Sequence, residues 1–147
     1  MAASLHLIKL CVGAEKVEDL TRWQETVRAR NDAAGRGAIT THVTRMWPKR
    51  ADALLDGGSI YWVFRGLVLA RQHVLALEER KAEDGTRRCA LVLDPEVVLT
   101  APQPRRPFQG WRYLLPTDAP PDLGPLGTPE ADLPTALAAD LSRLGVL

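Results

Sequence analysis

The sequence lacks the features that mark membrane, secreted and metal-binding proteins. It has no apolar run of about 18 residues, which excludes a transmembrane helix. Its first residues show no basic segment ahead of an apolar run, so no secretory signal is expected. Two cysteines and three histidines stand far apart, without the spacing of metal ligands. We therefore expect a cytoplasmic protein with no membrane partner, cofactor or metal.

Strong charge and catalytic motifs are missing as well. The net charge is only +1, so no overall positive field draws the protein to nucleic acid. The sequence contains no Walker loop, no G-x-G-x-x-G and no H-E-x-x-H pattern. Binding of an anion must therefore come from a local patch of basic residues, and no reaction is indicated.

The length and composition predict a single domain. A chain of 147 residues with 46% hydrophobic and 25% charged residues can bury a core of ordinary size. We divide it into a core over 1–116, a Pro/Gly-rich linker over 117–130 and a C-terminal docking helix over 131–147. That helix is predicted from leucines at helical spacing, Leu133, Leu137, Leu141 and Leu144.

The order of patterned segments predicts an α+β fold. Residues 14–35 have apolar residues at helical spacing, acids first and bases last, which is typical of a helix. A second, short helix is predicted over 49–58 after Pro48. Strands are predicted over 4–13, 38–47, 59–64, 67–79, 86–94 and 96–100, with a further one at 111–114. Short strands joined by tight turns predict a small bent mixed sheet or a barrel, flanked by an N-terminal and a C-terminal helix.

Two details of these elements carry expectations about packing. Trp23 is expected to pack in the core beside the buried face of the first helix. In the strand over 67–79, Arg71 and His73 interrupt a face otherwise lined by leucines. This pattern indicates either a strand that runs from the core to the mouth of a barrel or a bulge that swaps the two faces.

Two groups of basic and aromatic residues are candidates for a binding surface. Guanidinium groups match phosphate oxygens and stack on bases, and tryptophan offers a flat face for stacking. Neighbouring prolines would hold such loops still and so lower the entropy cost of binding. Alternatively, the arginines are solvated and the tryptophans pack at the rim of the core. The first group is Arg45, Trp47, Lys49 and Arg50, followed by Arg65, and the second is Arg105, Arg106, Trp111 and Arg112.

Whether these groups form a binding surface depends on whether two sequence segments lie side by side in the fold. If "HVTRMWPKR" (42–50) lies beside "PRRPFQGWRY" (104–113), it is a strand end that faces a ligand. Otherwise it is a solvated corner.

Arg71 and His73 form a second candidate site. A buried arginine needs a carboxylate or an anionic ligand. One interpretation is that the two residues line a small pocket. The other is that Arg71 pairs within the fold with one of Glu78, Glu79 or Asp94.

Covalent catalysis has little support in the sequence. A thiol nucleophile would be Cys11 or Cys89, with one of the histidines as its base, His6, His42 or His73. Both cysteines lie in predicted strands, away from a glycine-rich elbow, where thiols are usually inert. No catalytic residue is therefore assigned.

Several motifs resemble an uncharacterised bacterial family of small single-domain proteins without an assigned function. They are "LHLIKLCVG", "HVTRMWPKR", "LLDGGSIYWVFRG", "RRCALVLDPE" and "PRRPFQGWRYL", and together they span nearly the whole chain. This resemblance brings no activity with it.

A more distant resemblance is to PUA-like domains, including their ASCH and EVE relatives. It rests on "LLDGGSIYWVFRGLVLARQHVLALEE" and on the closing "PRRPFQGWRYL". The resemblance implies a small pseudobarrel flanked by helices, with RNA or a modified base as the ligand. The second strand and the Trp47-Pro48 tract have no counterpart in that pattern. The lysine, threonine and glutamate set of hydrolytic ASCH members is not found, so their activity is not carried over.

The resulting expectation is a non-catalytic module that binds RNA or a modified nucleotide. In it, Arg45, Arg50, Arg105 and Arg112 contact phosphate, and Trp47 or Trp111 stacks on a base. One alternative is a small hydrolase of modified nucleosides, with Arg71 and His73 in its pocket. Another is a protein-interaction module that uses the exposed tryptophans and the proline-rich loop.

Overall fold

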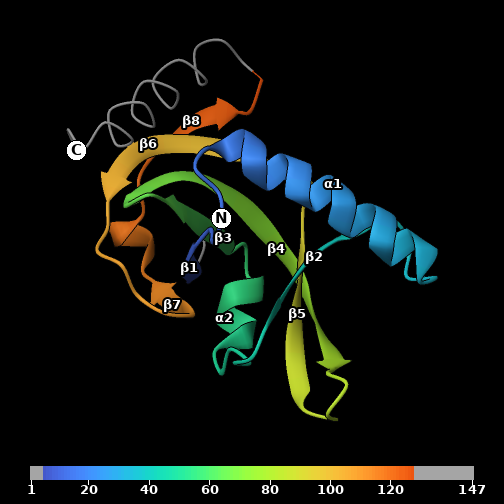
Figure 1. Ribbon diagram of the computed structural model, residues 1–147. Coiled ribbons are helices and arrows are strands. Elements are labelled where there is room, and N and C mark those ends of the chain that lie inside the picture. Colours follow the sequence, from blue (N-terminus) through green and yellow to red (C-terminus); the bar gives the residue numbers. More distant parts are fainter. Residues whose placement is uncertain (1–4, 128–147) are drawn as a thin grey trace.

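A computed structural model describes residues 5–127 and shows two helices packed around one large sheet (Figure 1). The helices are α1 (Val17–Ala33) and α2 (Ala51–Leu55), with a 3-10 turn η1 (Pro116–Asp118). The strands are β1 (His6–Leu10), β2 (Thr40–Thr44), β3 (Ser59–Phe64), β4 (Leu67–Lys81), β5 (Arg87–Leu93), β6 (Val98–Pro104), β7 (Trp111–Leu114) and β8 (Asp122–Pro125).

The eight described strands form a mixed sheet around β4. The order is β2-β5-β4-β3-β1-β7, with β6 paired to β4 and β8 paired to β6. β1 and β3 are parallel, and the other described pairs are antiparallel. Because β1 lies between β3 and β7, the first described strand lies inside the sheet rather than at its edge and brings the late strand β7 next to the start of the sequence.

The long strand β4 bends the sheet. Its first half pairs with β3 and β6, and its second half pairs with β5. The register with β5 shifts between Val74 and Ala76, and Leu75 at this bulge is 53% exposed. A bulge, one of the two alternatives considered for this strand, is therefore present, and it turns the β4–β5 hairpin away from the rest of the sheet.

Apolar residues cover both faces of the sheet, because successive side chains of a strand point to opposite sides. In β3, Ile60, Trp62 and Phe64 join the larger core under α1 and α2. Tyr61 and Val63, between them, join a smaller cluster on the other face. Continuous burial on both faces explains the uninterrupted apolar run of this strand.

Helix α1 is held across β2 by polar contacts. Asn31 donates to the Ile39 carbonyl at 2.8 Å and to the Thr41 hydroxyl at 3.0 Å. Arg28 donates to the Thr40 hydroxyl at 3.0 Å. These contacts fix the C-terminal half of α1 over the edge strand of the sheet, where the candidate site lies.

The α+β class is confirmed, and the sheet is larger than expected and open. The Pro/Gly-rich segment over 117–130 contains the end of η1 and adds strand β8 to the sheet. Strand β6 continues through Pro104, which pairs with Leu67. Proline is tolerated here because these residues lie near strand ends and sheet edges. The docking helix predicted over 131–147 lies outside the described residues.

The prediction that Trp23 packs in the core is wrong. Its side chain is 52% exposed, and the guanidinium of Arg30 lies 5.6 Å from the ring centroid. Each residue turns a helix by about 100°, so Trp23 points well away from Gln24, which is buried.

Among residues 5–127, no helix is long and apolar enough to span a membrane.

Candidate nucleic-acid interface

Three adjoining recesses share His42 and form one cleft between α1, β1, β2 and β7. We call it the His42 cleft. The β7 recess, about 460 Å³, also contains Lys9, Arg45 and Trp111. The hairpin recess, about 440 Å³, lies between α1, β2 and the β4–β5 hairpin. The β1 recess, about 180 Å³, lies between β1 and α1. The two larger recesses have the size of ordinary ligand pockets, roughly 300–1,000 Å³.

The charge of the cleft is of one sign. Lys9, Arg45 and Arg88 line the β7 recess. Five basic residues line the hairpin recess, namely Arg30, Arg36, Arg80, Lys81 and Arg88. No aspartate or glutamate is among the described residues that line the three recesses. A protein of net charge +1 thus concentrates positive charge on one surface, which favours an anionic ligand.

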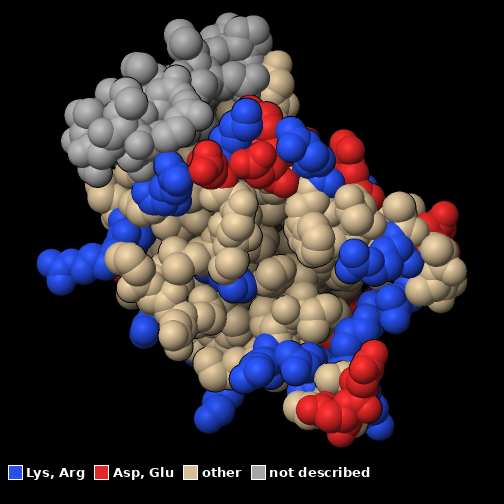
Figure 2. Space-filling model, viewed as in Figure 1, with Lys and Arg blue, Asp and Glu red and all other residues tan. Residues whose placement is uncertain are grey.

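The space-filling view shows where the charged side chains lie around the cleft. In Figure 2, basic side chains lie along the right and lower margins of the hollowed surface below α1. Acidic side chains gather above it, over the start of α1, and at the tip of the β4–β5 hairpin. Basic side chains also lie beside these acidic ones, so the acids lie outside the hollowed surface without forming a separate acidic patch.

His42 lies where the three recesses meet. Its ring packs edge-on against Trp62, with ring centroids 5.2 Å apart. Its Nε2 is buried and has no hydrogen-bond partner among the described residues. Burial, with a smaller contribution from the positive charge of Lys9, lowers the pKa of His42 to about 4. The imidazole is therefore uncharged at neutral pH and offers one nitrogen to a ligand in the cleft.

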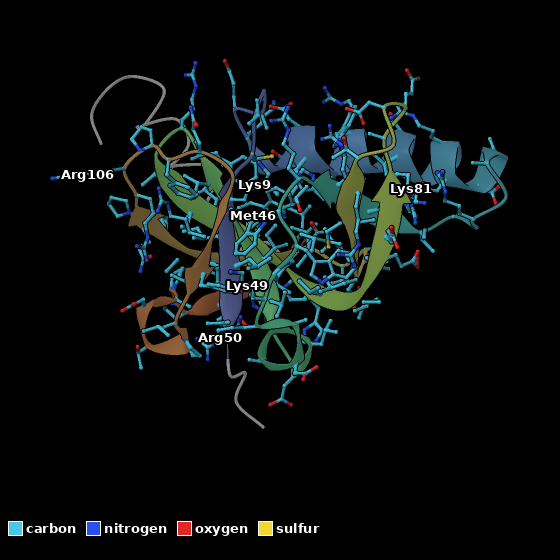
Figure 3. All side chains as sticks on the ribbon, turned by 90° about the horizontal axis from the view of Figure 1, so that it is seen from below. Lys9, Met46, Lys49, Arg50, Lys81 and Arg106 are labelled. Atoms are coloured by element: carbon cyan, nitrogen blue, oxygen red, sulfur yellow. The ribbon has the colours of Figure 1, made fainter. Side chains whose placement is uncertain are left out.

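Lys9 brings a partly buried ammonium group to the same place. It sits on β1 opposite Trp111 of β7 and Trp62 of β3. Burial lowers its pKa, and the neighbouring Cys11 opposes this. Figure 3 shows Lys9 beside Met46, in agreement with their shared recess. Partial removal from water strengthens the interaction of such a charge with an anion.

A buried network of amides supports the floor of the cleft. Gln24 of α1 and Gln72 of β4 donate to each other, at 2.6 and 2.8 Å. Trp62 donates from Nε1 to Gln72 at 3.0 Å, and Gln72 also donates to the Asp94 carbonyl. Because every polar group of this set has a partner, the network holds the indole on which His42 rests.

The structure brings together the two sequence segments whose proximity was in question. Trp111 donates from Nε1 to the Met46 carbonyl at 3.0 Å. The backbone N–H of Arg50 donates to the Tyr113 hydroxyl, also at 3.0 Å. The stretch 42–50 therefore lies beside 109–113, and Arg45 and Trp111 share the β7 recess.

The tryptophans of the two groups are less available than expected. Trp111 is only 7% exposed and belongs to the larger core. Trp47 is half-buried, and the guanidinium of Arg87 lies 4.2 Å from its ring centroid. Neither of these two indoles therefore offers an open face on which a base could stack. The exposed tryptophan of the cleft is Trp23, which lines the hairpin and β1 recesses.

Most other basic residues of the two groups lie outside the cleft. Lys49 and Arg50 are exposed near α2, and Arg106 points away from the body on the side opposite Lys81 (Figure 3). The remaining three have contacts elsewhere in the fold. These are Arg65 with Glu15 at 3.1 Å, Arg105 with Gln103 at 2.9 Å, and Arg112 with the Phe108 ring at 5.6 Å.

Arg71 is paired within the fold, with a carboxylate other than those expected. Its Nε and Nη2 donate to the two carboxylate oxygens of Asp122 of β8, at 2.8 and 2.6 Å. A third donor reaches the Ser59 hydroxyl at 3.0 Å. His73 lies one pleat further along β4, and its carbonyl accepts from the Asp94 N–H at 2.9 Å. Arg71 therefore belongs to the attachment of β8, and neither residue lines the His42 cleft.

Metal and thiol chemistry find no support among the described residues. No group of three or more His, Cys, Asp or Glu side chains in residues 5–127 is placed to hold a metal ion. Burial raises the pKa of Cys11 to about 12 and that of Cys89 to about 11. Both thiols are protonated at neutral pH and are poor nucleophiles in that form.

Sequence reasoning missed most of the cleft. The missed residues come from the end of α1, from the turn after it and from the two strands of one hairpin, namely Arg30, Arg36, Arg80, Lys81 and Arg88. Their spacing along the chain forms no motif. The one available signal was that basic residues gather at the end of α1 and on both arms of the β4–β5 hairpin, while their mutual proximity depends on the sheet register.

Comparison with known proteins gives a family and no activity. A family model described as "Protein of unknown function (DUF1489)" matches residues 7–147. No curated protein and no solved structure matches the chain.

Proposed function

We propose, for a chain that belongs to the DUF1489 family of proteins of unknown function, that the His42 cleft binds single-stranded RNA or a modified nucleotide without catalysis. The observation that carries the proposal is the charge of the cleft. Seven basic residues and no acidic one are among the described residues that line its three recesses. Such a surface suits the phosphate backbone of a nucleic acid.

The aromatic side chains of the cleft favour a single strand or a nucleotide over a duplex. Trp23 is exposed at the edge of two recesses, beside Arg30. Positively charged grooves with exposed aromatic rings are typical of proteins that bind unpaired bases by stacking. The resemblance to PUA-like domains agrees with this ligand class, and a PUA-like ancestry is part of the proposal.

The proposal can be tested by titrating the protein with a short single-stranded RNA and following tryptophan fluorescence at low and moderate salt. We expect quenching that weakens as salt rises, because phosphate contacts release counterions. Replacing Arg45 or Arg88 by alanine should weaken binding about tenfold, the usual effect of losing one charge-assisted hydrogen bond. Each replacement should also lower the salt slope by about 0.7, the value for one phosphate contact on a single strand.

Arg106→Ala is the matched control, because Arg106 points away from the body and lies outside the cleft. We expect its affinity and salt slope to equal those of the wild type. Absence of binding at low salt would refute the proposal for unmodified strands. Equal losses of affinity in the Arg106 and Arg45 variants would refute the location of the binding site in the His42 cleft.

A further inference from the structure

Two buried nitrogens without partners lie in side chains that line the hairpin recess. One is Nε2 of His42 and the other is Nη2 of Arg80. Neither has a hydrogen-bond partner among the described residues. Buried polar groups in folded proteins are nearly always bonded, and each exception calls for an explanation such as a bound polar ligand. Two exceptions in the lining of one recess indicate a ligand site there.

Arg80 is held in place while part of its guanidinium stays unused. Its Nη1 donates to Glu78 at 3.2 Å and to the Glu79 carbonyl at 3.4 Å. Its side chain is only 20% exposed, so the free Nη2 is not simply turned into solvent. Glu79 is engaged with Arg87 at 3.6 Å, and neither glutamate lines the recess. A donor fixed in this way is ready for an anionic acceptor.

The other basic side chains that line the hairpin recess determine how much negative charge a ligand can carry there. Arg30 reaches the recess from α1, Arg36 from the turn after α1, and Lys81 and Arg88 from the hairpin. An internal phosphodiester carries one negative charge, whereas a phosphomonoester carries about −1.5 to −2 at neutral pH and has three acceptor oxygens. Several cations around one recess without a carboxylate suit the more highly charged group.

We infer that the hairpin recess binds a terminal phosphomonoester, with the Arg80 guanidinium and His42 Nε2 as its buried contacts. This inference rests on the proposed function and narrows its ligand to a phosphorylated strand end or a free nucleotide. Trp23 lies at the rim of the same recess. The ring of the nucleotide that carries the phosphate would stack there.

The decisive experiment compares RNAs of one sequence that differ only at their ends. Fluorescence anisotropy would give Kd for 5′-phosphate against 5′-hydroxyl strands labelled at the 3′ end, and for 3′-phosphate against 3′-hydroxyl strands labelled at the 5′ end. We expect one kind of phosphorylated end to bind at least tenfold more tightly. Arg80→Gln should abolish that preference, whereas Arg45→Ala in the β7 recess should weaken all strands alike.

Competition identifies the source of the phosphate. Adenosine monophosphate, adenosine and inorganic phosphate would be titrated against the bound RNA, with Lys81→Gln as a second variant at an exposed position. Displacement by the monophosphate, but not by adenosine, supports a free nucleotide as a further ligand. Preference for phosphorylated strands without displacement by the monophosphate supports recognition of a strand end.

The inference and the proposed function fail in different ways. If RNA binds but phosphorylated and hydroxyl ends bind equally, the inference is overturned and the cleft remains an RNA site. Another outcome is that no RNA binds but the monophosphate quenches tryptophan fluorescence in the wild type and not in Arg80→Gln. That result would support the phosphate site in the hairpin recess and refute the proposal of RNA binding. If neither binds, both are overturned. Circular dichroism of each variant ensures that a loss reflects the site rather than the fold.

Discussion

At the scale of single residues, His42 combines two properties that a purely structural histidine rarely has. Its ring is part of the packing against Trp62 and lines a basic cleft, yet its buried Nε2 has no partner among the described residues. A buried nitrogen of this kind costs folding free energy unless something bonds to it. The cost is understandable if the nitrogen serves a ligand.

The lowered pKa of His42 predicts how stability depends on pH. The pKa is about 4 in the folded protein and 6.5 when unperturbed, so between these values the unfolded chain binds a proton that the folded chain does not. Stability is then complete above pH 6.5 and is lost as the pH falls toward 4. The loss amounts to about 3 kcal/mol in the free energy of unfolding.

Urea unfolding of the wild type and His42→Gln between pH 7 and 4 would measure this contribution. We expect the curve of the variant to be flatter over that range, although not flat, because the pKa of His6 is also lowered by burial. Carboxylates are common to both proteins and cancel in the difference. Parallel curves would contradict the assignment of an uncharged, buried His42.

At the scale of elements, the junction between α2 and β3 depends on one glycine. Gly58 is buried, donates to the Leu54 carbonyl at 2.8 Å and accepts from the Val74 N–H at 3.0 Å. A Cβ at this position would collide with the backbone carbonyl oxygens of Leu5 and Leu54. Backbone atoms of two different segments cannot move aside easily, so this position requires glycine for space.

We expect Gly58→Ala to lower the free energy of unfolding by about 3 kcal/mol, at the upper end of the cost of overpacking. Thermal and urea unfolding would measure it. Gly85→Ala is the control, because a Cβ there meets nothing within 4 Å and only the positive φ of +84° is strained. That change should cost about 1 kcal/mol. Equal costs at the two positions would contradict the packing of Leu5 and α2 against Gly58.

Local sequence patterns explain which helices and strands were predictable. Strand β3 matches its predicted bounds because its apolar run is continuous and ends at the Arg65-Gly66 turn, where both residues have positive φ. Helix α1 shows the expected buried face of Val17, Leu20, Gln24 and Val27. Strand β8 was missed because prolines and glycines in 117–130 indicate a linker, and its pairing with β6 is a tertiary contact.

At the scale of the whole molecule, the Arg71–Asp122 pair connects the last described strand to the centre of the sheet. Arg71 on β4 contacts both Asp122 of β8 and Ser59 of β3. Strand β8 thus meets the β3–β4 hairpin, which is distant from it in sequence, at one guanidinium. A two-point contact of this type is more specific than a single surface ion pair.

A double-mutant cycle would measure this connection. We expect Asp122→Ala to lower the free energy of unfolding by about 1 kcal/mol, a modest value because the carboxylate is 44% exposed and screened by water. Arg71→Met should cost a similar amount, and the double variant should cost less than the sum of the two. Additive effects would show that the pair contributes nothing to the attachment of β8. The cleft is on a different part of the fold, so RNA binding should be unchanged.

The arrangement of the molecule also decided which predicted site residues meet. The proximity of 42–50 and 109–113 follows from β1, which lies between β3 and β7 and aligns Lys9 with Trp111. Arg45 and Trp111 therefore share a recess, while Arg65, Arg105, Arg106 and Arg112 do not join them. Sequence spacing could not distinguish these residues, because each of them sits at the end of a strand or in a turn.

The α+β class, most of the strands, the buried face of α1 and the absence of a strong overall charge could all be predicted from the sequence. These properties are local or additive, since periodicity, turn chemistry and charge counts need no knowledge of the fold. Only the tertiary structure decided that the sheet is open, that Arg71 pairs with Asp122 and that the basic residues of α1 and the β4–β5 hairpin face one cleft around His42. The physical reason is that strand order and register set which distant side chains share a surface, and no single segment contains that information.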